Sequence, residues 1–157
     1  MNKIHETSIV SSSAKIGENV SIGPYCKIDK EVTIADNVTI LSHVSISGKT
    51  YIGDSTKIWP FAVIGSEPQD MKYDGENGSL EIGENNNIRE HVTMHFGTKD
   101  GGMATKIGDN NLFMVGAHIA HDCKVGSNCV FANNATLGGH VEVGDWAILG
   151  GLAAVHQ

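Results

Sequence analysis

One carboxylate and several imidazoles lie at related positions in the C-terminal part of the chain, and such groups can move protons. His118, His121 and Asp122 are close in sequence, and the interval from Asp122 to His140 equals that from His121 to Gly139. A carboxylate beside an imidazole holds one tautomer and stabilises the imidazolium, which makes the histidine an effective general base near neutral pH. Gly139 would leave room beside the His121 ring and could offer its N–H to a developing oxyanion. The pattern leaves open whether Asp122 serves His121 or His140.

This shared interval matters because it equals three periods of a six-residue repeat on which the chain is built. Every sixth residue from Ile4 to Ile64 is Ile or Val, and the residue two positions earlier is small or β-branched in most hexads. A period of six residues indicates a parallel β-helix, in which three hexads close one triangular coil. Residues three hexads apart then stack at about 4.8 Å, the spacing of paired strands. Asp122 and His140 are therefore expected to stand one coil apart.

The histidines fall outside the inward positions of this repeat. Counted from the aliphatic column, His118, His121, His140 and His156 all occupy outward positions. The three cysteines instead occupy the second inward column and lack the spacing of a thiolate metal site, so we expect small core residues and no disulfide framework. These are Cys26, Cys123 and Cys129.

Two segments interrupt the repeat. Residues 65–79 are rich in Gly, Pro and Asp and lack the aliphatic column, and residues 96–105 contain three glycines. The column resumes between them at Ile82, and after them at Ile107. We interpret both segments as excursions from the coil, and long loops inside compact domains are usually functional.

Composition limits the classes of protein. A chain of 157 residues fits one domain, and we take residues 1–157 as a single β-helix domain. The net charge of −7 and the lack of a basic stripe argue against nucleic acid and anionic membranes as partners. There is no apolar run of membrane-spanning length and no apolar signal segment at the N-terminus. We expect a cytoplasmic protein without stable membrane insertion.

Five motifs give the sequence a family resemblance. They are QDMKY at 69–73, AHIAHDC at 117–123, ANNATL at 132–137, GHV at 139–141 and AVHQ at 154–157. Together with the hexad repeat they closely resemble the UDP-N-acetylglucosamine acyltransferase family of hexapeptide-repeat acyltransferases. The resemblance implies an all-β fold, a left-handed parallel β-helix, and a homotrimer with active sites in the clefts between subunits.

The resemblance also implies an activity. The family moves an (R)-3-hydroxyacyl chain from acyl carrier protein to the 3-hydroxyl of UDP-N-acetylglucosamine, the first step of lipid A biosynthesis. By this resemblance His121 is the general base, Asp122 orients it, and the Gly139 N–H stabilises the tetrahedral oxyanion. Attack is direct, so no covalent acyl-enzyme, cofactor or metal is expected.

Further site residues follow from the same resemblance. We expect Gln69 and Asp70 near the sugar, and the remaining substrate-binding positions along the cleft: Lys72, His95, His118, His140, His156 and Gln157. The family's C-terminal helical domain is not part of these residues, and the last coil ends without a cap, so we expect a further segment to follow. The sequence does not decide the acyl-chain length, a hydroxyl or amine acceptor, or whether this chain is active alone.

Three alternatives use the same solenoid. A carbonic-anhydrase-like zinc enzyme would need three imidazoles, for which His118, His121 and His140 could be offered, although their spacing does not resemble that group and Asp122 suits a base better. Another hexapeptide-repeat acyltransferase, such as a relative that acylates an amine, is the second. The third is a structural or binding module in which the histidines are incidental.

Overall fold

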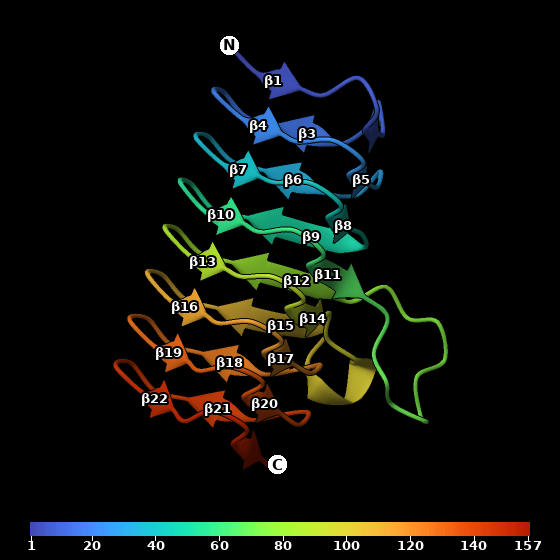
Figure 1. Cartoon of the computed structure of the whole chain (residues 1–157). Helices are drawn as coiled ribbons and strands as arrows, with labels where there is room; N and C mark the ends of the chain where they lie inside the picture. The colour runs from blue at the N-terminus through green and yellow to red at the C-terminus, as the bar shows by residue number, and fades with distance from the viewer.

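The computed structural model describes residues 1–157 and forms a three-sided solenoid of short strands (Figure 1). All strand pairs are parallel, and outside the excursions each strand pairs with the one three hexads further on, as Lys3 does with Ser21 and Ile4 with Ile22. The parallel β-helix predicted from the six-residue period is therefore confirmed. No helix in the structure has the length and apolar character required to cross a membrane.

Each side of the prism is one parallel sheet. Sheet A consists of β1 (Lys3–Ile4), β4 (Ser21–Ile22), β7 (Thr39–Ile40), β10 (Lys57–Ile58), β13 (Asn87–Ile88), β16 (Leu112–Phe113), β19 (Val130–Phe131) and β22 (Ile148–Leu149). Sheet B consists of β2 (Ile9–Val10), β5 (Lys27–Ile28), β8 (Ser45–Ile46), β11 (Val63–Ser66), β14 (Thr93–His95), β17 (His118–Ile119), β20 (Thr136–Leu137) and β23 (Ala154–Val155). Sheet C consists of β3 (Lys15–Ile16), β6 (Thr33–Ile34), β9 (Lys49–Ile52), β12 (Ser79–Ile82), β15 (Ala104–Ile107), β18 (Lys124–Val125) and β21 (Glu142–Val143).

Tight corners between the sheets depend on residues that tolerate positive φ. The corner between sheets C and A repeats asparagine in this left-handed conformation, with φ from 54° to 61°. Asparagine adopts that region more readily than most residues with a side chain. The residues are Asn19, Asn37, Asn85, Asn110 and Asn128. Repetition of the same corner keeps successive coils in register.

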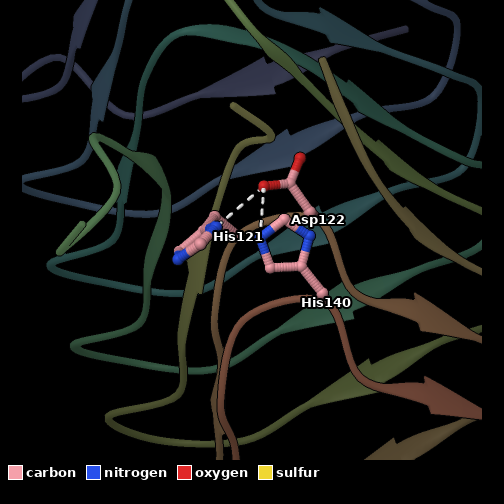
Figure 2. Close-up of side chains that lie close together, drawn as sticks. All are labelled: His121, Asp122 and His140. Carbon is pink, nitrogen blue, oxygen red and sulfur yellow. Dashed lines mark hydrogen bonds and ion pairs between the residues drawn. The ribbon is translucent and has the colours of Figure 1, made fainter. Parts of the chain in front are cut away.

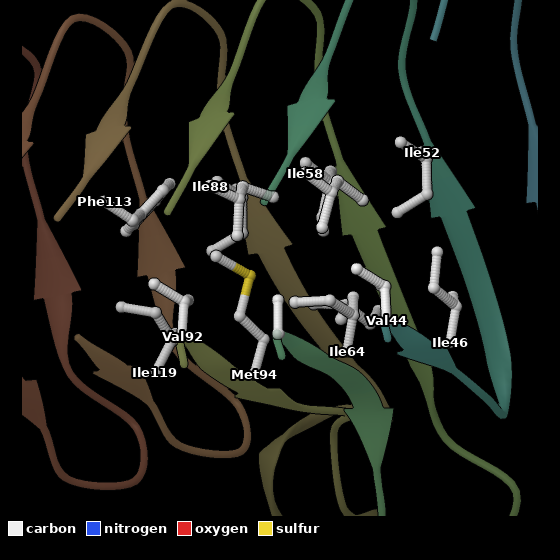
Figure 3. Packing of buried hydrophobic residues seen from close by; sticks show 14 of the residues in the cluster. Val44, Ile46, Ile52, Ile58, Ile64, Ile88, Val92, Met94, Phe113 and Ile119 are labelled. Atoms are coloured by element: carbon white, nitrogen blue, oxygen red, sulfur yellow. The ribbon is translucent and has the colours of Figure 1, made fainter. Parts of the chain in front are cut away.

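The aliphatic column fills the interior of the prism (Figure 3). Ile46, Ile52, Ile58 and Ile64 in the middle coils are fully buried, and Met94 continues the column after the first excursion. Burial of each such side chain contributes roughly 1.5–3 kcal/mol relative to exposure. The three cysteines are free and buried, as the repeat predicts. The core therefore supplies a rigid support for the outward side chains.

Two inward positions carry side-chain amides. Asn86 and Asn111 occupy the second inward column, and both are buried. The amide of Asn86 donates to the Gly108 carbonyl at 2.8 Å, and its Oδ1 accepts the Asn111 N–H at 2.9 Å. Asn111 repeats the pattern by accepting the N–H of Cys129 at 2.7 Å. Buried amides with these partners satisfy their hydrogen bonds and tie three coils together.

The two excursions leave the prism on the same side (Figure 1). The first connects β11 to β12, and the second connects β14 to β15 and contains the 3₁₀ helix η1 (Lys99–Gly101). They touch: the Lys99 N–H donates to Glu76 Oε1 at 3.2 Å, and the rings of Tyr73 and Phe96 meet edge to face at 5.9 Å between centroids. Phe96, at the start of the second excursion, is buried and joins the core. The excursions are thus packed against each other and against the prism.

Candidate functional site

His121 and Asp122 form a hydrogen-bonded pair at the corner that follows β17 (Figure 2). His121 Nδ1 lies 2.7 Å from Asp122 Oδ2. Asp122 has φ +61°, so side chains no longer alternate at this corner as they do in a strand. The side chains of His121 and Asp122 therefore lie on the same side of the chain. The His121 ring is 12% exposed and the Asp122 side chain is fully buried. The structure therefore pairs Asp122 with His121, the choice that the sequence left open.

The Asp122 carboxylate is surrounded by hydrogen-bond donors. The Thr98 N–H donates to Oδ1 at 2.7 Å, and the Thr98 hydroxyl donates to Oδ2 at 2.6 Å. The Asp122 N–H in turn donates to Thr105 Oγ1 at 2.8 Å. An ionised carboxylate only accepts hydrogen bonds, and three donors, counting His121, satisfy it. Burial without such partners would be strongly unfavourable.

This arrangement assigns the protons on the His121 ring. Because the partner of Nδ1 is a carboxylate oxygen, Nδ1 carries the hydrogen and donates it. The lone pair of Nε2 is then free to accept a proton, and the carboxylate stabilises the imidazolium that results. A histidine oriented in this way can act as a general base.

Gly139 lies directly against the His121 ring. A Cβ at position 139 would stand 2.5 Å from His121 Cε1 and 2.6 Å from Nε2, so only glycine leaves the ring where it is. The N–H of Gly139 donates to no group in the chain. A backbone donor that is free and adjacent to the base can stabilise negative charge on a substrate oxygen.

His140 stands one coil beyond Asp122, as the spacing predicts. Its Nε2 lies 3.8 Å from Asp122 Oδ2, which is beyond hydrogen-bond distance, and its ring meets His121 edge to face at 5.1 Å between centroids. The ring is 25% exposed. His140 therefore borders the His121–Asp122 pair without replacing His121 as its partner.

His118 and His95 form a second pair of rings near the first. His118 Nδ1 lies 2.7 Å from Thr93 Oγ1, and the two histidine rings meet edge to face at 4.9 Å. Burial lowers the pKa of His95 to about 4, with a smaller effect of repulsion from His118 and His121. Burial likewise lowers the pKa of His118. Nδ1 of His95 is buried and has no hydrogen-bond partner.

Gln69 and Asp70, expected near the sugar, and Lys72, expected along the cleft, lie on the first excursion. Lys72 Nζ pairs with Asp100 Oδ2 of the second excursion at 3.2 Å, and that hydrogen bond is the main cause that raises the pKa of Lys72. Asp70 Oδ1 accepts the N–H of Lys72 at 3.0 Å. Gln69 is exposed and makes no hydrogen bond within the chain. Lys72 and Asp70 are thus placed together, and Gln69 projects from the same loop.

His156 and Gln157 lie in the coil after Gly139. Both are exposed, and His156 Nδ1 contacts only the carbonyl oxygen of Gln157, at 3.3 Å. They make no side-chain hydrogen bond to His121 or Asp122. The structure brings His95, His118, His121, Asp122 and His140 together, and leaves these two at the border.

Sequence reasoning missed two residues that hold Asp122: Thr105 accepts its backbone N–H, and Thr98 donates to its carboxylate. Thr105 sits two positions before the column residue Ile107, so the inward rule could have found it. Thr98 belongs to an excursion that has no repeat, and nothing in the sequence marks it. A groove over sheet C lies elsewhere on the chain and does not include these residues.

Comparisons with known proteins agree with this architecture. A protein-family model described as bacterial transferase hexapeptide (six repeats) matches residues 104–139, and one described as the GMPPB C-terminal domain matches residues 2–67. The match to six-residue repeats, with the three-sided β-helix, defines the class: the chain is a hexapeptide-repeat protein.

Solved structures narrow this assignment. A crystal structure of UDP-N-acetylglucosamine acyltransferase is 47% identical, with a TM-score of 0.98 over 99% of this chain. LpxA from Acinetobacter baumannii is 50% identical over 98% of the chain, with a TM-score of 0.97. The UDP-N-acetylglucosamine acyltransferase from Campylobacter jejuni is 42% identical over 99%, with a TM-score of 0.95.

Within its class, the chain belongs to the UDP-N-acetylglucosamine acyltransferase family, as its motifs predict. It spans 60% of the length of each of these three proteins.

Proposed function

We propose that the protein transfers an (R)-3-hydroxyacyl chain from acyl carrier protein to the 3-hydroxyl of UDP-N-acetylglucosamine, with His121 as the general base. The observation that carries the proposal is the buried Asp122 carboxylate at 2.7 Å from His121 Nδ1, which leaves Nε2 as a free proton acceptor. Sequence identity of 42–50% to solved acyltransferases supports the choice of substrates.

The reaction can be written with the groups in place. His121 Nε2 removes the proton from the sugar hydroxyl as its oxygen attacks the thioester carbonyl carbon. The carbonyl oxygen becomes an oxyanion, for which the free N–H of Gly139 is the donor. When the intermediate collapses, the carbon–sulfur bond breaks and the imidazolium returns the proton to the leaving thiolate. Asp122 stays ionised and offsets the positive charge on His121 in both steps.

Substrate positioning is proposed for the remaining residues. Lys72, which is 67% exposed, and Asp70 and Gln69 on the same excursion would contact the sugar nucleotide. His118, His140, His156, Gln157 and His95 would border the cleft. We also propose a homotrimer in which a neighbouring subunit closes this cleft, as the family resemblance implies.

The test is an acyltransferase assay with UDP-N-acetylglucosamine and hydroxyacyl carrier proteins of several chain lengths, run on the full-length protein. His121→Ala and His121→Asn should abolish transfer while the fold and the trimer persist, because His121 lies outside the core cluster. His5→Ala, which removes an exposed histidine of the first coil, is the matched control and should retain activity. Substantial turnover by the His121 variants would contradict the role of general base.

Metal analysis tests the zinc alternative in the same samples. His121, Asp122 and His140 each offer a ligand atom within 4.8 Å of the others, but two imidazoles and one carboxylate are not the three imidazoles that the alternative requires. Nδ1 of His121 is also engaged by Asp122. Stoichiometric zinc in the active protein would favour the alternative over the base mechanism.

A further inference from the structure

The second excursion folds back over the Asp122 side chain. Thr98 is buried and donates both its N–H and its hydroxyl to the carboxylate, one to each oxygen. Gly101, a little further along the excursion, lies so close that a Cβ there would overlap the Asp122 carboxylate. The excursion therefore contacts Asp122 with two donors from one residue and with the bare backbone of another.

The conformation of the excursion is fixed from within. The Thr98 carbonyl accepts the N–H of Gly101 at 3.2 Å and that of Met103 at 2.8 Å, which closes the short turn of η1. Gly102 then ends the turn with φ +88°, a conformation that favours glycine. Thr98 is thus held at both its side chain and its carbonyl, and its N–H points at Asp122 Oδ1.

The contacts restrict what the carboxylate can do. With Oδ1 bonded to the Thr98 N–H and Oδ2 to the Thr98 hydroxyl, rotation of the carboxylate would break both bonds. The full burial of the side chain also keeps water from replacing the donors. Oδ2 is the same atom that accepts from His121 Nδ1. The position of the imidazole therefore depends on Thr98 through Asp122.

We propose that Thr98 and Gly101 are positioning residues for the general base, and that holding the Asp122 carboxylate is the function of the excursion at 96–105. The expected loss of kcat rests on the proposed function. The role of Thr98 and Gly101 in orienting Asp122 and His121 does not depend on it. Neither residue contacts the reacting atoms in the proposed mechanism. Thr98 supplies the donors that orient the carboxylate, and Gly101 supplies the space that lets the excursion close over it.

The main test compares two substitutions at one position. Thr98→Val removes the hydroxyl and keeps the shape, whereas Thr98→Ser keeps the hydroxyl. A hydrogen bond to a charged group is worth enough that its loss should lower kcat by about 10- to 100-fold, with KM for the sugar nucleotide little changed. Thr98→Ser should recover most of kcat. Thr56→Val, which removes another buried threonine hydroxyl far from Asp122, is the matched control for effects of lost stability alone.

A second pair of variants tests whether Gly101 leaves the space that the Asp122 carboxylate needs. Gly101→Ala should displace the carboxylate and lower kcat, because the added methyl group overlaps it. Gly144→Ala is the control, since a Cβ at Gly144 meets nothing within 4 Å. Equal kcat for Thr98→Val and wild type, or equal losses for Thr98→Val and Thr98→Ser, would overturn the proposal.

Crystal structures separate this inference from the proposed function. If the wild-type protein transfers no acyl group to the sugar nucleotide, the proposed function fails, and the position of His121 in Thr98→Val still tests the positioning role. A His121 ring turned away from Asp122 supports it. A His121–Asp122 pair unchanged from the wild type overturns it.

Discussion

Lys72 and Asp100 join the two excursions through an ion pair of 3.2 Å between Nζ and Oδ2. Lys72 comes from the loop that the family motif QDMKY marks, and Asp100 comes from the loop that holds Asp122. The side chains are 67% and 48% exposed, so the pair is an accessible contact that a bound substrate can compete for. A lysine proposed to contact the anionic sugar nucleotide is therefore engaged by a carboxylate before substrate arrives.

Removal of Asp100 should release this lysine. We predict that Asp100→Asn lowers KM for the sugar nucleotide and leaves kcat unchanged, because Lys72 no longer exchanges one anionic partner for another. Exposed ion pairs contribute about 0–1 kcal/mol, so the free energy of unfolding should barely change. Steady-state kinetics at low and high salt measure the effect. A higher KM in Asp100→Asn would show instead that Asp100 positions Lys72, and Lys72→Met serves as the comparison with the cation removed.

Gly139 offers a test of space around the base. We predict that Gly139→Ala lowers kcat strongly while the free energy of unfolding falls little, since the new methyl group would stand 2.5 Å from His121 Cε1 and push the ring from Asp122. The backbone N–H is retained in this variant, so the loss reports the position of His121 and not the oxyanion donor. Gly138→Ala is the matched control, because its Cβ would meet its nearest neighbour, the Val155 carbonyl oxygen, at an ordinary 3.4 Å. Equal kcat in the two variants would contradict the assignment of His121.

The inward column can be tested by charge. Ile34 is 1% exposed, so Ile34→Asp should lower the free energy of unfolding by more than about 4 kcal/mol, because a carboxylate would enter an apolar interior without a partner. Thr33→Asp on the same strand points outward and should change stability by less than about 1 kcal/mol. Urea denaturation followed by circular dichroism measures both. Similar free energies of unfolding for the two variants would be inconsistent with the inward assignment of Ile34.

His95 should make stability depend on pH. Its pKa is about 4 in the folded protein, against an ordinary value of 6.5, so the unfolded chain binds the proton first as the pH falls. The free energy of unfolding should therefore decrease between pH 6.5 and about 4, by roughly 3 kcal/mol from this residue, and level off below that range. His95→Gln removes the contribution of this histidine to the pH dependence of the free energy of unfolding. Urea denaturation at pH 7 and pH 4.5 should show a smaller acid loss in His95→Gln than in wild type, and equal losses would refute the prediction.

The regular part of the molecule could be predicted from the sequence because one rule governs it. The uninterrupted column from Ile4 to Ile64 indicates the solenoid, and the spacing of three hexads places His140 above Asp122 and Gly139 beside His121. These relationships hold because the two coils concerned pair at an interval of three hexads, as Lys124 does with Glu142 and Val125 with Val143.

The remaining features depend on the parts that do not repeat. Asp122 pairs with His121 because of the positive φ at position 122 and the donors of Thr98, and neither follows from a period. The burial of His95 likewise depends on the second excursion, which leaves the prism at the end of β14. Contacts between Lys72 and Asp100 involve two loops whose mutual position only the fold determines.

The two excursions add residues to the chain without adding to the length of the solenoid along its axis. Val63 stacks on Thr93 and Thr93 on His118, although more chain separates the members of each pair than in an ordinary coil. The register shifts only after Ile64, where the first excursion begins, and the pairs before it stay aligned. Residues added at that edge of the prism therefore leave the inward aliphatic column aligned. On such a scaffold the loops that border a site can change in length or sequence one at a time, while the strand pairing of the other coils stays the same.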